Sequence, residues 1–117
     1  MKQLIKTIYQ TTIKTGGASF NIDGVAPNSG FMVATIGAEK VINVKDFNKR
    51  ILKKFVKKHI KKLKKDNSLC VGTWKDNNKI YLDLSNNILD KTKAVSQGIK
   101  NKQLAIFDLS TFDSLYL

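Results

Sequence analysis

Residues 69–84 form two segments in which apolar and polar positions alternate, and this pattern restricts the fold more than any other feature of the chain. The segments LCVGTW and KIYLDL flank a four-residue loop at 75–78, so we expect a β-hairpin in which Trp74 pairs with Lys79. Apart from Thr73, one face is aliphatic and carries Leu69, Val71, Ile80, Leu82 and Leu84. The other face carries Cys70, Trp74, Lys79, Tyr81 and Asp83. The aliphatic face is expected to lie on the core of an antiparallel sheet.

Residues 46–65 predict a single long amphipathic helix. Asp46 is an acceptable N-cap, and the helix is expected to end at Asp66. Apolar side chains recur at helical spacing at Phe47, Ile51, Leu52, Phe55, Val56, Ile60 and Leu63. Most other positions in the segment are lysine, so the helix is expected to bury one stripe and expose a basic surface.

The remaining segments predict further helices and short strands. Residues 2–14 place apolar side chains on one helical stripe that ends at two glycines, although their β-branched content leaves a strand as the alternative. Residues 90–100 suit a helix with Ala94, Val95 and Ile99 pointing inward. Short strands are expected at 18–22, 31–36, 41–44 and 104–109, with an edge strand in the tail at 111–117.

From residue 31 onward the expected order is strand, helix, strand, strand, helix, strand. This is the split βαβ, or ferredoxin-like, order, with the helices mainly on one face of an antiparallel sheet. We therefore predict one α+β domain over residues 1–117, with about four or five strands and an additional N-terminal helix. A single Cys excludes an internal disulfide.

The net charge of +12 is concentrated in the predicted basic helix. Residues 45–66 hold eleven Lys and Arg against two Asp, a net charge of +9, which favours nucleic acid or a protein that handles it as the partner. Only Arg50 is an arginine, which argues against specific base recognition, because arginine is the side chain preferred for bidentate contacts to guanine. The alternative is that the lysines only form a solvated helix face. The candidate contacts are Lys49, Arg50, Lys53, Lys54, Lys57, Lys58, Lys61, Lys62 and Lys65.

The hairpin face that carries Trp74, Lys79 and Tyr81 is a second candidate surface. In an open sheet such a face can stack bases, but the aromatic pattern of RNA-recognition modules is absent and Asp83 opposes phosphate approach. The aromatic side chains are therefore expected to pack under the N-terminal segment or against a partner, including a second copy of the chain.

No catalytic, metal or cofactor site is expected from the titratable residues. Asp83 and Asp108 lie in the similar segments YLDLS and IFDLS, but one strand would separate them, which places the carboxylates about 10 Å apart. His59 and Cys70 lack a third residue that would orient a nucleophile and base. An enzymatic function is therefore not predicted.

Several segments resemble a pattern found in small, mostly uncharacterised proteins of bacteriophages and other mobile elements. The matching segments are GGASFN (16–21), PNSGFMVA (27–34), GTW and KIYLDLS within 72–85, and NKQLAIFDLS (101–110). The resemblance implies a phage or integrated element as the context, and no site residues follow from it.

Together with the charge, this resemblance predicts a non-enzymatic binding protein with an accessory or counter-defence role in the bacterial cytoplasm. The alternative is a structural protein that forms a homo-oligomer or a complex through the Trp74 and Tyr81 face. Membrane binding is not expected, because the basic segment lacks Trp and its apolar stripe is needed for the core.

Overall fold

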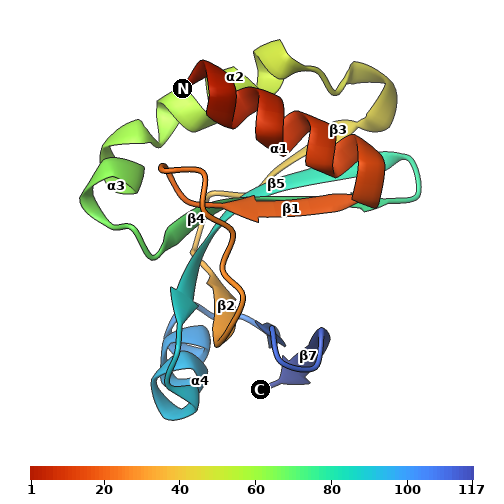
Figure 1. The fold of residues 1–117 in the computed structure, drawn as a ribbon. Helices are drawn as coiled ribbons and strands as arrows, with labels where there is room; N and C mark the ends of the chain where they lie inside the picture. The colour runs from red at the N-terminus through yellow and green to blue at the C-terminus, as the bar shows by residue number, and fades with distance from the viewer.

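The computed structural model describes residues 1–117 as an α+β fold with four α-helices and a seven-stranded antiparallel sheet (Figure 1). The class predicted from the sequence is confirmed. The helices are α1 (Lys2–Thr15), α2 (Lys49–Lys58), α3 (Ile60–Lys65) and α4 (Lys91–Lys100), with a 3₁₀ turn, η1, at Val44–Asp46. The strands are β1 (Gly17–Phe20), β2 (Phe31–Ala34), β3 (Lys40–Asn43), β4 (Leu69–Asp76), β5 (Lys79–Ile88), β6 (Ala105–Asp108) and β7 (Asp113–Tyr116).

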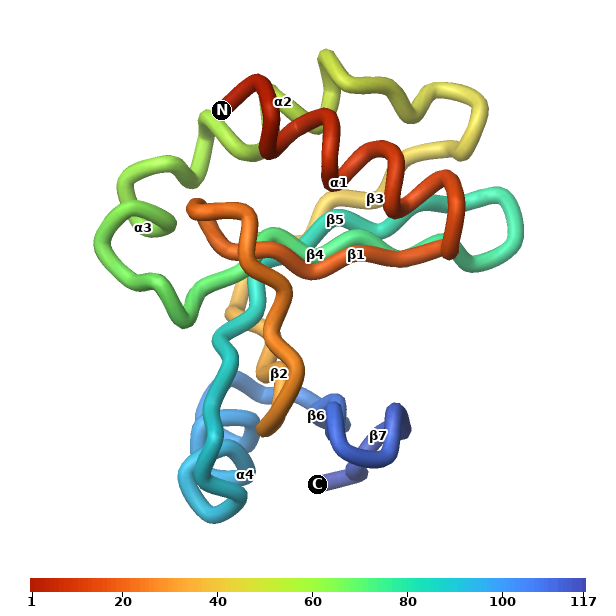
Figure 2. The backbone as a smooth tube through the Cα atoms, viewed as in Figure 1, coloured from red at the N-terminus to blue at the C-terminus, as the bar shows by residue number.

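The long strand β5 joins two halves of the sheet. Its first residues pair with β3 and its last residues pair with β2, so the strand order is β1-β4-β5-β2-β6-β7 with β3 beside β5. Figure 2 shows the β1, β3 and β4 half lying across the molecule and the β2, β6 and β7 half descending from it. The predicted total of four or five strands is too low, because the segments expected as strands at 18–22, 41–44 and 111–117 all join the sheet, as β1, β3 and β7. A ferredoxin-like order is not confirmed for the sheet as a whole, although β4, β5, β2 and β6 occupy consecutive positions in it.

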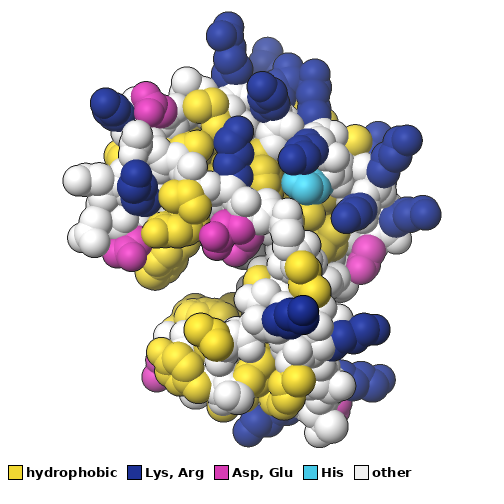
Figure 3. Space-filling model, turned by 180° about the vertical axis from the view of Figure 1, so that it is seen from behind, with side chains coloured by type: hydrophobic (Ala, Val, Ile, Leu, Met, Phe, Trp, Pro, Cys, Tyr) yellow, Lys and Arg dark blue, Asp and Glu magenta, His cyan; other side chains and the backbone are white.

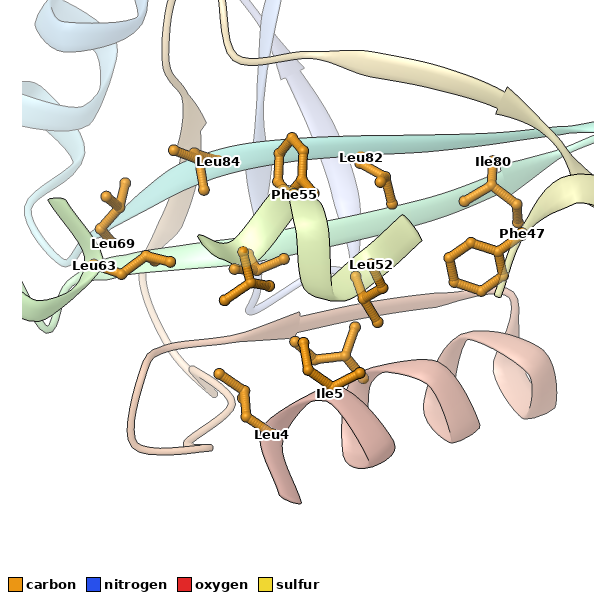
Figure 4. Close-up of a cluster of buried hydrophobic side chains, with 13 residues drawn as sticks. Leu4, Ile5, Phe47, Leu52, Phe55, Leu63, Leu69, Ile80, Leu82 and Leu84 are labelled. Atoms are coloured by element: carbon orange, nitrogen blue, oxygen red, sulfur yellow. The ribbon is translucent and has the colours of Figure 1, made fainter. Parts of the chain in front are cut away.

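The larger core lies between helices α1, α2 and α3 and one face of the β4–β5 hairpin (Figure 4). Its thirteen buried side chains include the aliphatic face expected for the hairpin. At about 1.5–3 kcal/mol for each fully buried large apolar side chain, this cluster supplies most of the drive for folding. The helices contribute Leu4, Ile5, Ile8, Leu52, Phe55, Val56 and Leu63.

A smaller core lies under α4 in the other half of the sheet. Phe31, Val33, Ala94 and Ile106 form it, and strand alternation places Val33 opposite Asn86, on the same face as Leu84. All four helices therefore cover one face of the sheet, and its other face is left open. The inward side of α4 differs from the expectation in one residue: Ile99 is 60% exposed, and Gly98 is buried in its place.

The single helix predicted over 46–65 is wrong, because the chain breaks at His59. His59 has φ −109° and ψ 13°, and it ends α2 and precedes α3. The break turns the chain so that Leu63 lies beside Leu69 at the start of β4 (Figure 4). The N-cap is also two residues later than expected. Asn48, rather than Asp46, accepts a hydrogen bond from Ile51 N at 2.9 Å.

The hairpin is present with a shifted register. Trp74 pairs with Tyr81 rather than with Lys79, and Asp76 pairs with Lys79 across a two-residue turn in place of the expected four-residue loop. The turn residue Asn77 has φ 54°, the left-handed conformation that such turns use and that Asn tolerates. Because the shift preserves the two-residue alternation, the faces expected from the sequence are correct.

None of the helices combines the length and the apolar character that a membrane-spanning segment needs.

Candidate functional site

A groove between α1 and α2 gathers six basic side chains. It has a volume of about 980 Å³, and its lining includes no carboxylate. The six are Lys2, Lys6, Lys49, Arg50, Lys53 and Lys57. Such a concentration of positive charge in one concavity makes the groove a candidate site for an anionic partner.

The packing of the two helices explains how the groove forms. Leu4, Ile5 and Ile8 of α1 are buried against the core, which leaves Lys2 and Lys6, four residues apart, along one edge of the helix. In α2, burial of Leu52 and Phe55 leaves four basic residues on the side that faces α1: Lys49, Arg50, Lys53 and Lys57. The sequence stripe of each helix therefore fixes which lysines meet.

One set of contacts ties the start of α2 to the middle of α1. Tyr9 stacks on Phe47 with ring centroids 5.3 Å apart, and Lys49 Nζ lies 5.7 Å from the centroid of the Tyr9 ring. Such a cation–π contact contributes about 0.5–1 kcal/mol at an exposed site. It also orders the first lysine of α2 beside α1.

The other predicted lysines lie outside the groove. Lys54 and Lys58 are exposed elsewhere on α2, and Lys61, Lys62 and Lys65 are exposed on α3. Figure 3 shows Lys and Arg side chains spread over the helical half of the molecule in several directions. The structure thus brings together four of the nine predicted contacts and adds Lys2 and Lys6. The signal for the added pair was present in the sequence, since both lie on the edge of the predicted N-terminal stripe.

His59 lies between the two basic helices and is held toward its neutral form. Partial burial lowers its pKa, and the positive charges of Lys58 and Lys62 lower it further. Its ring packs on Phe55 at a centroid distance of 4.8 Å. His59 therefore acts as a packing residue at the helix break and adds little charge near neutral pH.

The predicted Trp74 surface lies on the open face of the sheet. Trp74 is 63% exposed and does not pack under the N-terminal helix, and its partner Tyr81 is half-buried. Lys79 lies at the hairpin end, where its Nζ donates a hydrogen bond to Asn43 Oδ1 at 2.8 Å. The structure therefore pairs Trp74 with Tyr81, and Lys79, two residues before Tyr81 on the same face, directs its ammonium group to Asn43.

The two similar aspartates face opposite sides of the sheet. Asp83 lines a cavity on the open face, and so does Phe107, which places the adjacent Asp108 on the other side. Asp108 accepts hydrogen bonds from Ser110 N at 2.9 Å and Ser110 Oγ at 2.7 Å, which lower its pKa. The two carboxylates do not converge on one site.

Cys70 is buried, and its pKa is raised to about 11, mainly by burial. The thiol is therefore protonated at neutral pH and is a poor nucleophile. No group of three or more His, Cys, Asp or Glu side chains in residues 1–117 is arranged to hold a metal ion.

Comparison with known proteins gives no relative for this chain: no family model, no curated protein and no solved structure matches it.

Proposed function

We propose that the protein is a non-enzymatic nucleic-acid-binding protein that holds the phosphate backbone in the groove between α1 and α2. The observation that carries the proposal is the set of six basic side chains around a groove that has no lining carboxylate. Lysines on two rigid helices neutralise a row of phosphates without reading bases, so the affinity is sequence-tolerant and salt-dependent.

The biological context remains part of the proposal. The sequence resemblance supports a phage or mobile element, with an accessory or counter-defence role in the cytoplasm of the host bacterium. In such a role the protein blocks access to the nucleic acid, or to the groove of a host protein that binds it. A host protein bound in the same groove would have to present acidic side chains in place of phosphates, and it is the alternative to nucleic acid that the experiment below distinguishes.

The test is a salt titration of binding to a duplex DNA and a single-stranded RNA of mixed sequence. For duplex DNA, six phosphate contacts give a slope of log K against log salt of about −5, because each contact contributes about −0.9. Substituting Lys6→Gln, Arg50→Gln and Lys53→Gln together should reduce the slope to about −3. Neutral glutamine preserves most of the side-chain length and helix propensity, so the helices are retained.

The matched control removes the same charge from another place. Lys61→Gln, Lys62→Gln and Lys65→Gln lie on α3 outside the groove and give the same net charge as the groove variant. The control should change the slope by less than about one contact. Equal losses in the two variants would show that binding depends on total charge and not on the groove. Retention of an acidic protein partner without any nucleic-acid affinity would also overturn the proposal.

A second candidate function rests on the exposure of Trp74, which is 63% accessible on the open face. A large exposed aromatic side chain is typical of interaction surfaces, so self-association or a protein complex through the Trp74 and Tyr81 face is the alternative. Light scattering over a range of concentrations distinguishes it. A dimer that Trp74→Ser dissociates, and that is insensitive to salt, would favour this function over nucleic-acid binding.

A further inference from the structure

The open face of the sheet contains a cavity of about 550 Å³ where the two halves meet. It lies on the side opposite the basic groove, because the side chains that line it from β4 and β5 alternate with those of the core. In Figure 3 the hollow between the two halves is bordered by hydrophobic and acidic side chains. The lining includes Met32, Trp74, Asp83, Phe107, Leu109 and Phe112. No lysine or arginine lines it, although the chain has 21 such residues.

Trp74 forms one wall of this cavity and is held from behind by a glycine. Gly17 of β1 pairs with Trp74 across the strands, and a Cβ at Gly17 would lie 3.0 Å from Trp74 Cε3. The indole therefore rests on the bare backbone of β1, while 63% of the side chain remains exposed. One face of the ring is fixed and much of the remainder is available to a ligand.

Asp83 supplies the only titratable group in the lining. Its carboxylate leans over Gly72, the residue opposite it on β4, so closely that a Cβ at Gly72 would overlap Asp83 Oδ1. No hydrogen-bond donor holds this carboxylate, and burial together with repulsion from Glu39 raises its pKa to about 6. Every side-chain oxygen or nitrogen that is fully enclosed in this structure has a hydrogen-bond partner. The Asp83 oxygens have no partner, so they are not fully enclosed and can be reached from the cavity.

We propose that this cavity binds a small organic cation that carries N–H donors on an ammonium, amidinium or guanidinium group, with Asp83 as its counter-ion and Trp74 as its aromatic wall. A carboxylate without a protein donor is satisfied by a ligand that brings both charge and N–H groups. The face of an indole is the aromatic surface that cations prefer, and Phe107 and Phe112 add apolar area for the body of the ligand.

The charge pattern separates this ligand class from the alternatives. An anion would be repelled by Asp83 and by Glu39 without any basic side chain in the lining to offset them. A neutral apolar ligand would leave the carboxylate desolvated and unpaired, which costs free energy. The excess of positive charge lies over the helices on the other face, and ionic screening at physiological salt limits its reach to about 8 Å.

The experiment uses the full chain at a concentration at which light scattering gives a monomer. Trp74, the only tryptophan of the chain, reports binding through its fluorescence. Benzamidine is the probe, and benzamide and benzoate are its neutral and anionic counterparts of similar shape. Benzamidine should change the Trp74 emission saturably, and the other two compounds should bind at least tenfold more weakly. Equal binding of benzamide and benzamidine, or no binding of benzamidine up to about 10 mM, would overturn the proposal.

Two variants and the pH assign the effect to the carboxylate. Asp83→Asn keeps the shape and removes the charge, and it should weaken benzamidine binding at least tenfold, whereas Asp108→Asn should leave it unchanged. Binding by the native protein should weaken as the pH falls below about 6, where Asp83 takes up a proton. Glu39 is the other acid that acts on this carboxylate, so Glu39→Gln should shift that midpoint to lower pH. Undiminished binding by Asp83→Asn would contradict the assigned counter-ion.

Discussion

Replacing Asp83 with Asn should stabilise the protein at neutral pH, and the size of the effect follows from its pKa. The pKa rises from an ordinary value of 3.8 to about 6 in the folded state, chiefly through burial, so between these values the folded protein holds a proton that the unfolded chain has lost. Stability therefore falls as the pH rises from about 4 to about 6 and stays low above that. A shift of about two units at about 1.4 kcal/mol per unit corresponds to about 3 kcal/mol.

An Asn side chain does not ionise, so Asp83→Asn removes this loss. The variant and the native protein should have similar free energies of unfolding at pH 4, and the variant should be more stable by about 3 kcal/mol at pH 7. Urea denaturation followed by far-ultraviolet circular dichroism at pH 4, 5, 6, 7 and 8 measures the difference.

The control substitution has the opposite sign. Hydrogen bonds from Ser110 lower the pKa of Asp108, so that carboxylate adds stability at neutral pH that is lost as the pH falls through its folded pKa. Asp108→Asn should therefore destabilise the protein at pH 7 and matter less at low pH. The reasoning about Asp83 fails if Asp83→Asn changes the stability by the same amount at every pH, or if its advantage is larger at pH 4 than at pH 7.

Three further substitutions have expected outcomes that denaturant unfolding can check. Thr12 Oγ1 donates its only proton to Ile8 O at 2.7 Å, so the Thr73 hydroxyl has to donate to Thr12 Oγ1. Thr12→Val should lower the free energy of unfolding by about 1–3 kcal/mol, because it leaves the buried Thr73 hydroxyl unpaired. Thr73→Val should lower it by less, because Thr12 keeps its bond to Ile8 O. Gly72→Ala should destabilise the native protein by about 1 kcal/mol, because the new Cβ overlaps the Asp83 carboxylate. In an Asp83→Ala background that overlap is absent and Ala suits a strand better than Gly, so the same substitution should be neutral or stabilising. Asn48→Ala should cost about 1 kcal/mol through loss of the N-cap, whereas Asp46→Ala should have little effect; the opposite ranking would restore the cap expected from the sequence.

The sequence predicted the faces of the sheet better than its pairing. The division of the hairpin into a core side and an open side depends only on the two-residue alternation, which is unchanged when the register shifts by two. The register itself depends on the turn, and the choice between a two-residue and a four-residue loop rested on whether Asn77 adopts a positive φ. The pattern of apolar residues does not contain that information.

The basic helix shows a similar limit. Its apolar spacing from Leu52 to Leu63 is compatible with one continuous helix, and neither Gly nor Pro marks a break. The break at His59 is imposed by tertiary packing, since Leu63 has to reach the core beside Leu69. Tertiary packing also explains why neither the basic groove nor the cavity on the open face could be predicted as a whole from the sequence. The groove needs Lys2 and Lys6, which lie more than forty residues before the first residue of α2, and the cavity needs β5 to span both halves of the sheet.

The two proposed sites should act independently, because the sheet and the helical layer separate them. On β4, Thr73 points into the core toward Thr12, whereas its neighbours Gly72 and Trp74 belong to the open face, so a change on one side leaves the other side's packing in place. Packed layers lie about 10 Å apart, which is more than the screening length of about 8 Å at physiological salt. The groove variant with three glutamines should therefore alter benzamidine binding by less than about twofold, and Asp83→Asn should leave the salt slope of DNA binding unchanged. A variant of one site that abolishes binding at the other would show that the two surfaces share a ligand or a conformational change, and it would require one bipartite site in place of two.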